Sequence, residues 1–150
     1  SFTIKLMSPI FEGTINPASG QTINVTANAE TGFAITKSMI ELTDYNNNLY
    51  CVVPDAKGVQ PNNEEGGNDA WKAAQINDVW VTKDANNTYI KKFSMQSYEE
   101  AADGKVTQEG AIVLYADPLP TTTETSMKVN VKDCWGYKKT QEVSVTIVKQ

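Results

Sequence analysis

The 150-residue chain contains no histidine and no arginine, so all 13 of its positive charges are lysines. Without histidine the chain cannot form a Ser-His-Asp triad, a Cys-His nucleophile pair or a zinc site that needs an imidazole ligand. Without arginine it has no guanidinium group to hold a phosphate or a guanine base in a bidentate way. These absences exclude much hydrolase and nucleic-acid-binding chemistry, and we expect no enzyme.

Positive charge is scarce and long apolar runs are missing. The 18 carboxylates give a formal net charge of -5, which opposes binding to a nucleic-acid backbone or an anionic membrane surface. The longest apolar run, residues 111–116, is far shorter than the ~20 residues of a membrane-spanning helix. We therefore expect one soluble domain over residues 1–150, with no nucleic-acid partner and no direct membrane insertion.

Alternating apolar and polar side chains predict β-strands along most of the chain. The predicted strands are 2–6, 21–27, 39–43, 49–53, 79–82, 89–95, 111–116, 126–132 and 141–147. Residues 111–116 have the continuous apolar character of a strand buried on both faces. The last two segments predict the clearest hairpin, because Met127, Val129 and Val131 share one face, as do the apolar residues of the returning strand.

Two short helices are expected beside the strands. The polar segment at about 54–78 shows no alternation of apolar and polar side chains, so it predicts a long insertion. Near its end, Asn68 can cap a helix over 69–75. Ser97 and Glu100 have the spacing of a capping box, and Gly104 can end the second helix. Short strands with frequent turn signals and few helices indicate an all-β fold, an antiparallel β-sandwich of about seven to nine strands.

Two stretches resemble parts of known bacterial domains. Residues 129–147, two alternating strands around Asp133-Cys-Trp-Gly136, resemble the last two strands of PKD-like and other immunoglobulin-like domains. Residues 19–26, a glycine turn before a threonine-rich strand, are similar to the second strand of such domains. The 16 threonines and 13 asparagines resemble the composition of surface lipoproteins of gut Bacteroidetes.

The resemblance implies a single immunoglobulin-like domain over residues 1–150, with the polar insertion at about 54–78. It also implies a location outside the cell, at the cell surface or in the periplasm, and we expect any signal or lipid anchor to lie outside this sequence. The implied function is a non-catalytic module for adhesion, scaffolding or spacing, whose partner is a protein or a glycan.

The three tryptophans favour an alternative function, a carbohydrate-binding module. Trp71, Trp80 and Trp135 could each offer a flat apolar face to a sugar ring and an N–H donor to a hydroxyl. The competing interpretation is that each indole covers an open end of the core.

A calcium site is the one candidate for a cofactor. Asp44, Asn46, Asn48 and Asp55 partly follow the alternating oxygen ligands of a calcium loop. Such a loop requires glycine at its sixth position, where this chain has Leu49. An Asn-rich hairpin turn is therefore the alternative interpretation.

Cysteines and carboxylates leave two further questions open. Cys51 and Cys134 could form a disulfide, although the strand order we expect separates them beyond bridging distance. Adjacent carboxylates at 64–65 and 99–100 could serve general acid–base catalysis in a third interpretation, a carboxylate hydrolase, but such pairs are usually solvated surface.

Overall fold

The structure, a computed structural model, describes residues 14–17, 21–43, 49–53, 76–133 and 136–150. In this part of the chain all regular structure is β-strand, and no helix is long and apolar enough to cross a membrane. The described strands are β1 (Thr14–Asn16), β2 (Thr22–Thr26), β3 (Phe33–Thr36), β4 (Glu41–Thr43), β5 (Leu49–Cys51), β6 (Ile76–Thr82), β7 (Lys92–Gln96), β8 (Glu99–Glu100), β9 (Val106–Gln108), β10 (Ala111–Tyr115), β11 (Thr123–Asp133) and β12 (Lys138–Val148).

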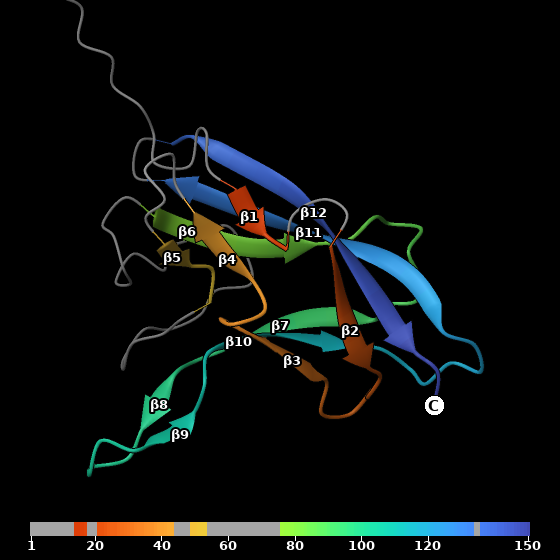
Figure 1. Ribbon diagram of the computed structural model, residues 1–150, viewed down its shortest axis with the longest axis horizontal. Coiled ribbons are helices and arrows are strands. Elements are labelled where there is room, and N and C mark those ends of the chain that lie inside the picture. Colours follow the sequence, from red (N-terminus) through yellow and green to blue (C-terminus); the bar gives the residue numbers. More distant parts are fainter. Residues whose placement is uncertain (1–13, 18–20, 44–48, 54–75, 134–135) are drawn as a thin grey trace, which may run out of the picture.

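These strands form a four-stranded sheet of order β2-β12-β11-β6 and two three-stranded sheets, β3-β10-β7 and β1-β4-β5 (Figure 1). A separate hairpin, β8–β9, projects from the rest. Strand pairs are antiparallel throughout, with one exception. β2 runs parallel to β12, with Thr22 opposite Ser144 and Thr26 opposite Val148.

The hairpin of β11 and β12 confirms the strongest sequence prediction. Met127 lies opposite Val143, and Thr125 lies opposite Val145. The apolar side chains predicted to share the inner face are all fully buried, namely Met127, Val129, Val131, Val143, Val145 and Ile147. Burying each such side chain contributes about 1.5–3 kcal/mol, so this hairpin supplies much of the core.

β10 is buried on both faces, as its apolar run predicts. Ile112 and Leu114 point into the core, opposite Ile35 and Phe33 of β3. Val113 points the other way and is still only 5% exposed. The turn that leads into β3 covers it, because Gly32 packs directly against its side chain.

One hydrophobic cluster joins the three larger sheets. It contains Ile15 of β1, Leu42 of β4, Val25 of β2 and Val79 of β6, together with the inner residues of β10, β11 and β12. The predicted hairpin around 44–48 is confirmed in its strands, since β4 pairs with β5 from Thr43 opposite Leu49. The described part of the chain is thus all-β with a sandwich-like core.

The helix predicted from Ser97 to Gly104 is wrong, because these residues form the β8–β9 hairpin. The capping box does not close: Ser97 Oγ donates to Glu99 Oε1 at 3.3 Å, and Tyr98 Oη donates to Glu100 Oε1 at 2.9 Å. Both glutamates therefore bind neighbouring side chains instead of a helix N-terminus.

Gly104 ends a hairpin turn instead of a helix. Its N–H donates to the carbonyl of Ala101 at 3.0 Å, and the Ala101 N–H donates to the carbonyl of Lys105 at 2.8 Å. With φ at 84°, Gly104 takes the left-handed position of a three-residue hairpin loop. Left-handed glycine serves both the helix end and this turn, so the same signal fits either structure.

Other departures are smaller. β1, β3 and the parallel pairing of β2 with β12 had no counterpart in the sequence prediction. The predicted strand at 2–6, the predicted helix at 69–75 and most of the insertion at 54–78 lie outside the described residues. Cys51 lies on β5, whereas Cys134 is outside the described residues, so the disulfide stays an open question.

Replacing Gly32 by alanine is expected to destabilise the fold strongly. Gly32 has φ at 72°, and a Cβ there would collide with Val113 Cγ1 and lie 3.1 Å from Tyr115 Cε1. The left-handed conformation and the overpacking together predict a loss of about 2–5 kcal/mol in the free energy of unfolding, measured by urea denaturation.

Gly104→Ala is the matched control, because it has a similar φ but no described atom within 4 Å of the added Cβ. It should cost only about 1–2 kcal/mol. Equal losses in the two variants would contradict the close packing of Gly32 on β10.

Candidate functional site: the outer face of the four-stranded sheet

One face of the four-stranded sheet points away from the core, and we call it the outer face. Successive side chains of a strand alternate between the two faces of its sheet, so the polar residues next to the buried ones face outward. These outward residues include Thr22, Asn24, Thr26, Trp80, Thr82, Glu124, Ser126, Lys128, Asn130, Lys132, Lys138, Thr140, Glu142, Ser144 and Thr146. They carry hydroxyls, amides, carboxylates, three lysines and one indole.

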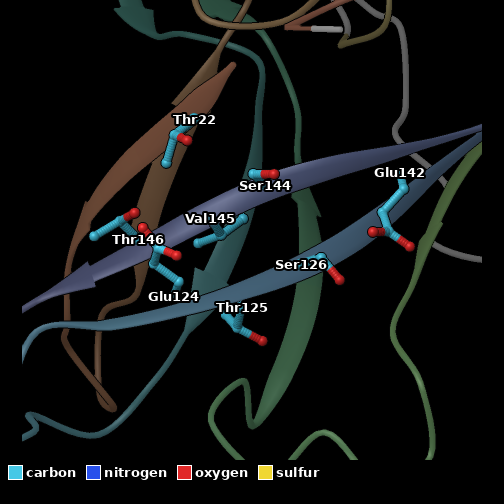
Figure 2. A pocket seen from close by; sticks show the side chains of 8 residues that line it. All are labelled: Thr22, Glu124, Thr125, Ser126, Glu142, Ser144, Val145 and Thr146. Atoms are coloured by element: carbon cyan, nitrogen blue, oxygen red, sulfur yellow. The ribbon is translucent and has the colours of Figure 1, made fainter. Parts of the chain in front are cut away.

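A hollow of about 300 Å³ lies on this face over β2, β12 and β11. It is lined by Thr22, Glu124, Thr125, Ser126, Glu142, Ser144, Val145 and Thr146 (Figure 2). Ser126 is opposite Ser144, and Ser144 is opposite Thr22. Three hydroxyl groups therefore form a row across three strands.

Two carboxylates flank this row of hydroxyls. Glu124 is opposite Thr146 on one side of the row, and Glu142 is opposite Lys128 on the other. Lys128 Nζ lies 3.0 Å from Asp84 Oδ1, in an ion pair whose side chains are 40% and 58% exposed, so it contributes little to stability. The hollow therefore offers hydroxyl and carboxylate oxygens to a ligand that can donate hydrogen bonds.

Trp80 lies further along the same face, on β6, and its side chain is half-buried. Beside it, Asn130 of β11 is only 8% exposed. Asn130 Nδ2 donates to the Trp80 carbonyl at 3.3 Å and to Thr82 Oγ1 at 3.2 Å. Thr140 Oγ1 of β12 donates to Asn130 Oδ1 at 2.7 Å. This network joins three strands beside the indole.

The indole of Trp80 also lies close to a lysine side chain. Lys138 Nζ lies 5.6 Å from the centroid of the Trp80 ring, within the range of a cation–π interaction, which contributes about 0.5–1 kcal/mol at exposed sites. The exposed part of the indole, the lysine and the nearby hydroxyls together offer an aromatic contact with polar groups around it.

A second hollow, of about 430 Å³, lies next to β2. It is lined by Pro17, Gln21, Thr22, Ile23, Asn24, Ser38 and Met39. Met39 is 39% exposed, so this hollow has a partly apolar lining.

Of the predicted site residues, the structure places Trp80 on the outer face. Trp71, Trp135, Asp44, Asn46, Asn48 and Asp55 all lie outside the described residues. The calcium loop and two of the three tryptophan sites therefore stay predictions. Within the described ranges, no group of three or more acidic or cysteine residues could hold a metal ion.

The sequence prediction missed the hollow and the role of Asn130. The alternation that identified β11 and β12 already places Glu142, Ser144 and Thr146 on one face. That pattern indicates only a solvated face, because it does not tell which strands come next to it. The row of hydroxyls needs Thr22, which is more than a hundred residues away in the sequence.

Comparison of the chain with protein-family models, curated proteins and solved structures gives no match. Function must therefore be argued from the chain's own fold and surface.

Asn130→Ala is expected to destabilise the protein by about 1–3 kcal/mol, because a nearly buried amide with partners on the two neighbouring strands is removed. Chemical denaturation followed by Trp fluorescence measures this loss. Asn24→Ala, an exposed asparagine on the same face, is the control and should stay within about 0.5 kcal/mol of the parent protein. A loss at Asn130 no larger than at Asn24 would contradict the network.

Proposed function

We propose that the chain is a non-catalytic, immunoglobulin-like module of a cell-surface or periplasmic protein, serving in adhesion, scaffolding or spacing. Strand order is the observation that carries this proposal. When β3, β6, β7, β10, β11 and β12 are lettered B to G in chain order, one sheet reads B-E-D and the other contains C-F-G. These are the two groupings of strands in immunoglobulin-like sandwiches.

The chain differs from a minimal domain of that kind in its additions. β4 and β5 lie between the strands lettered B and C, and the β8–β9 hairpin lies between D and E. Trp80 is on strand C, where antibody domains carry a buried tryptophan. Here its neighbours Val79 and Val81 are buried instead, so the indole belongs to the outer face.

Surface chemistry supports a module that works by binding or by linking. The outer face presents hydroxyls, amides, carboxylates and lysines from four strands. The net charge of -5 opposes binding of the module to a nucleic-acid backbone. A rigid sheet that holds such groups in fixed rows is suited to a protein or glycan partner at the cell surface. We also propose, from the resemblance of residues 19–26 and 129–147 and of the composition, that the module is of the PKD-like kind found in surface proteins of Bacteroidetes.

Surface labelling tests the proposed location. Antibodies against the chain should label intact cells of the organism that encodes it, or label them once only the outer membrane has been permeabilised. A cytoplasmic protein serves as the control for lysis. Labelling that requires lysis of the inner membrane would contradict a surface or periplasmic module.

Carbohydrate binding is the second candidate function, and the position of Trp80 favours it. The indole is half-buried on an outer sheet face, next to Asn130, Thr82 and Thr140. An aromatic ring with hydrogen-bonding groups around it is a combination that holds a sugar ring. Calcium stays part of this candidate through the predicted loop at Asp44 and Asp55.

Trp80→Ala is expected to weaken glycan binding by about tenfold or more, because a contact of about 1.4 kcal/mol or more is lost. Isothermal titration against a panel of neutral oligosaccharides measures the affinity, with and without calcium. Trp80→Tyr keeps an aromatic face and should retain most of the affinity. Failure of every glycan to bind, or equal binding by the alanine variant, would exclude this candidate.

A further inference from the structure

We infer that the β8–β9 hairpin is a docking edge for an extended segment of a partner protein in which basic side chains alternate with apolar ones. This inference names the partner chemistry of the binding module proposed above, on which its biological use rests. The hairpin lies between β7 and β10 in the chain and projects from the three larger sheets (Figure 1).

The two strands of the hairpin leave their outer edges without a strand partner. In the described part of the chain β8 pairs only with β9, whereas β7, the strand before them, pairs with β10. A two-stranded sheet alone is marginally stable in water, and a third strand or a packed neighbour is what it needs. An extended peptide binds such an edge through the backbone N–H and C=O groups that the sheet leaves unpaired.

Side-chain hydrogen bonds hold the hairpin in shape where a core of its own is missing. Gln108 Nε2 of β9 donates to the Ser97 carbonyl at 2.9 Å. Gln96 Nε2, at the end of β7, donates to the Glu109 carbonyl at 2.9 Å. Both bonds cross the base of the hairpin, so its edges are already in the extended form that strand addition requires, and less ordering is needed on binding.

A small hollow at the base of the hairpin offers a contact for an apolar side chain. Its volume is about 110 Å³, many times the roughly 10–15 Å³ that one water molecule needs. Val106 of β9 is 48% exposed, which leaves an apolar side chain in contact with solvent beside this hollow. The hollow is lined by Lys37, Tyr98, Val106, Glu109 and Gly110.

The charge of the hairpin selects its partner. Residues 97–109 contain four carboxylates and one lysine. That lysine, Lys105, lies 3.8 Å from Asp103 in the exposed loop, whereas Glu99 and Glu100 lie on β8 itself. Such an edge repels a second copy of the same hairpin, because like charges across a strand pair are destabilising. It attracts an added strand that carries lysine or arginine side chains.

Titration with a capped heptapeptide of alternating lysine and valine tests the docking edge. The full chain is labelled with nitrogen-15, and amide chemical shifts and amide hydrogen exchange are followed by NMR. Shift changes should be confined to residues 97–110 and Lys37, and amides along the paired edge should exchange more slowly. No shift changes at millimolar peptide, or changes centred on another part of the chain, would overturn the docking edge.

A heptapeptide of alternating glutamate and valine is the matched probe for charge. It has the same length and the same apolar side chains, so it should bind at least about tenfold more weakly if the carboxylates of the hairpin select the partner. Equal affinity for the two peptides would contradict that selection.

Glu99→Gln together with Glu100→Gln should weaken binding of the lysine–valine peptide by about tenfold or more. Each amide keeps an oxygen that can accept from Ser97 or Tyr98, so the hairpin keeps its shape while its charge falls. Glu124→Gln with Glu142→Gln removes the same charge from the outer face and should leave affinity within about twofold. Equal weakening in the two double variants would mean general attraction to an acidic protein and would overturn the inference.

Val106→Thr replaces an apolar side chain by one of similar shape and should weaken peptide binding by about threefold or more. Val148→Thr, at a valine of β12 that is 39% exposed, is the control and should leave binding unchanged. Equal effects in the two variants would contradict a contact at Val106.

Sedimentation equilibrium of the chain without peptide tests the alternative occupant. A dimer that Val106→Thr disrupts would assign the edge to a second copy of the chain and would overturn the inference. None of these outcomes bears on surface labelling or glycan titration, so failure of the docking edge and failure of the proposed function are distinguishable.

Discussion

The register of the β11–β12 hairpin is the constraint on which the rest of the structure depends. The two strands pair from Thr123 opposite Ile147 to Lys132 opposite Lys138. Because side chains alternate with a period of two, a slip of one residue would turn every buried side chain of a strand to solvent. The register therefore decides which residues fill the core and which form the outer face. β6 and β2 pair with the free edges of this hairpin and continue both faces.

Asn130 shows how the outer face can contain a nearly buried polar group without a large energetic cost. A buried amide that lacks partners costs about 1–3 kcal/mol, but here the side-chain oxygen accepts from Thr140, and the nitrogen donates to Trp80 and Thr82. The partners come from β6 and β12, on either side of β11. The same network that satisfies Asn130 holds the backbone of Trp80, so the position of the indole depends on three strands at once.

The sequence could predict those features that depend on neighbouring residues. Strict alternation was sufficient for the β11–β12 hairpin, and the apolar run at 111–116 was sufficient for the burial of β10 on both faces. Between Ser97 and Gly104 the local signals are ambiguous, because an acidic residue and a left-handed glycine suit a hairpin turn as well as a helix. Contacts between distant segments, such as Thr22 with Ser144, leave no local trace, so neither the parallel pairing nor the hollow could be predicted.

The turn after β2 connects the four-stranded sheet to the β3-β10-β7 sheet, and it is held both by its own hydrogen bonds and by its contact with β10. Asn28 Oδ1 accepts from the N–H groups of Glu30 and Thr31, both at 2.9 Å, which fixes the turn internally. Gly32 then packs on Val113, and β3 follows at once, paired along β10. Because β10 is buried on both faces, the turn cannot lengthen without disturbing the most enclosed strand of the core. The close contact at Gly32 therefore also keeps the connection between the two sheets short.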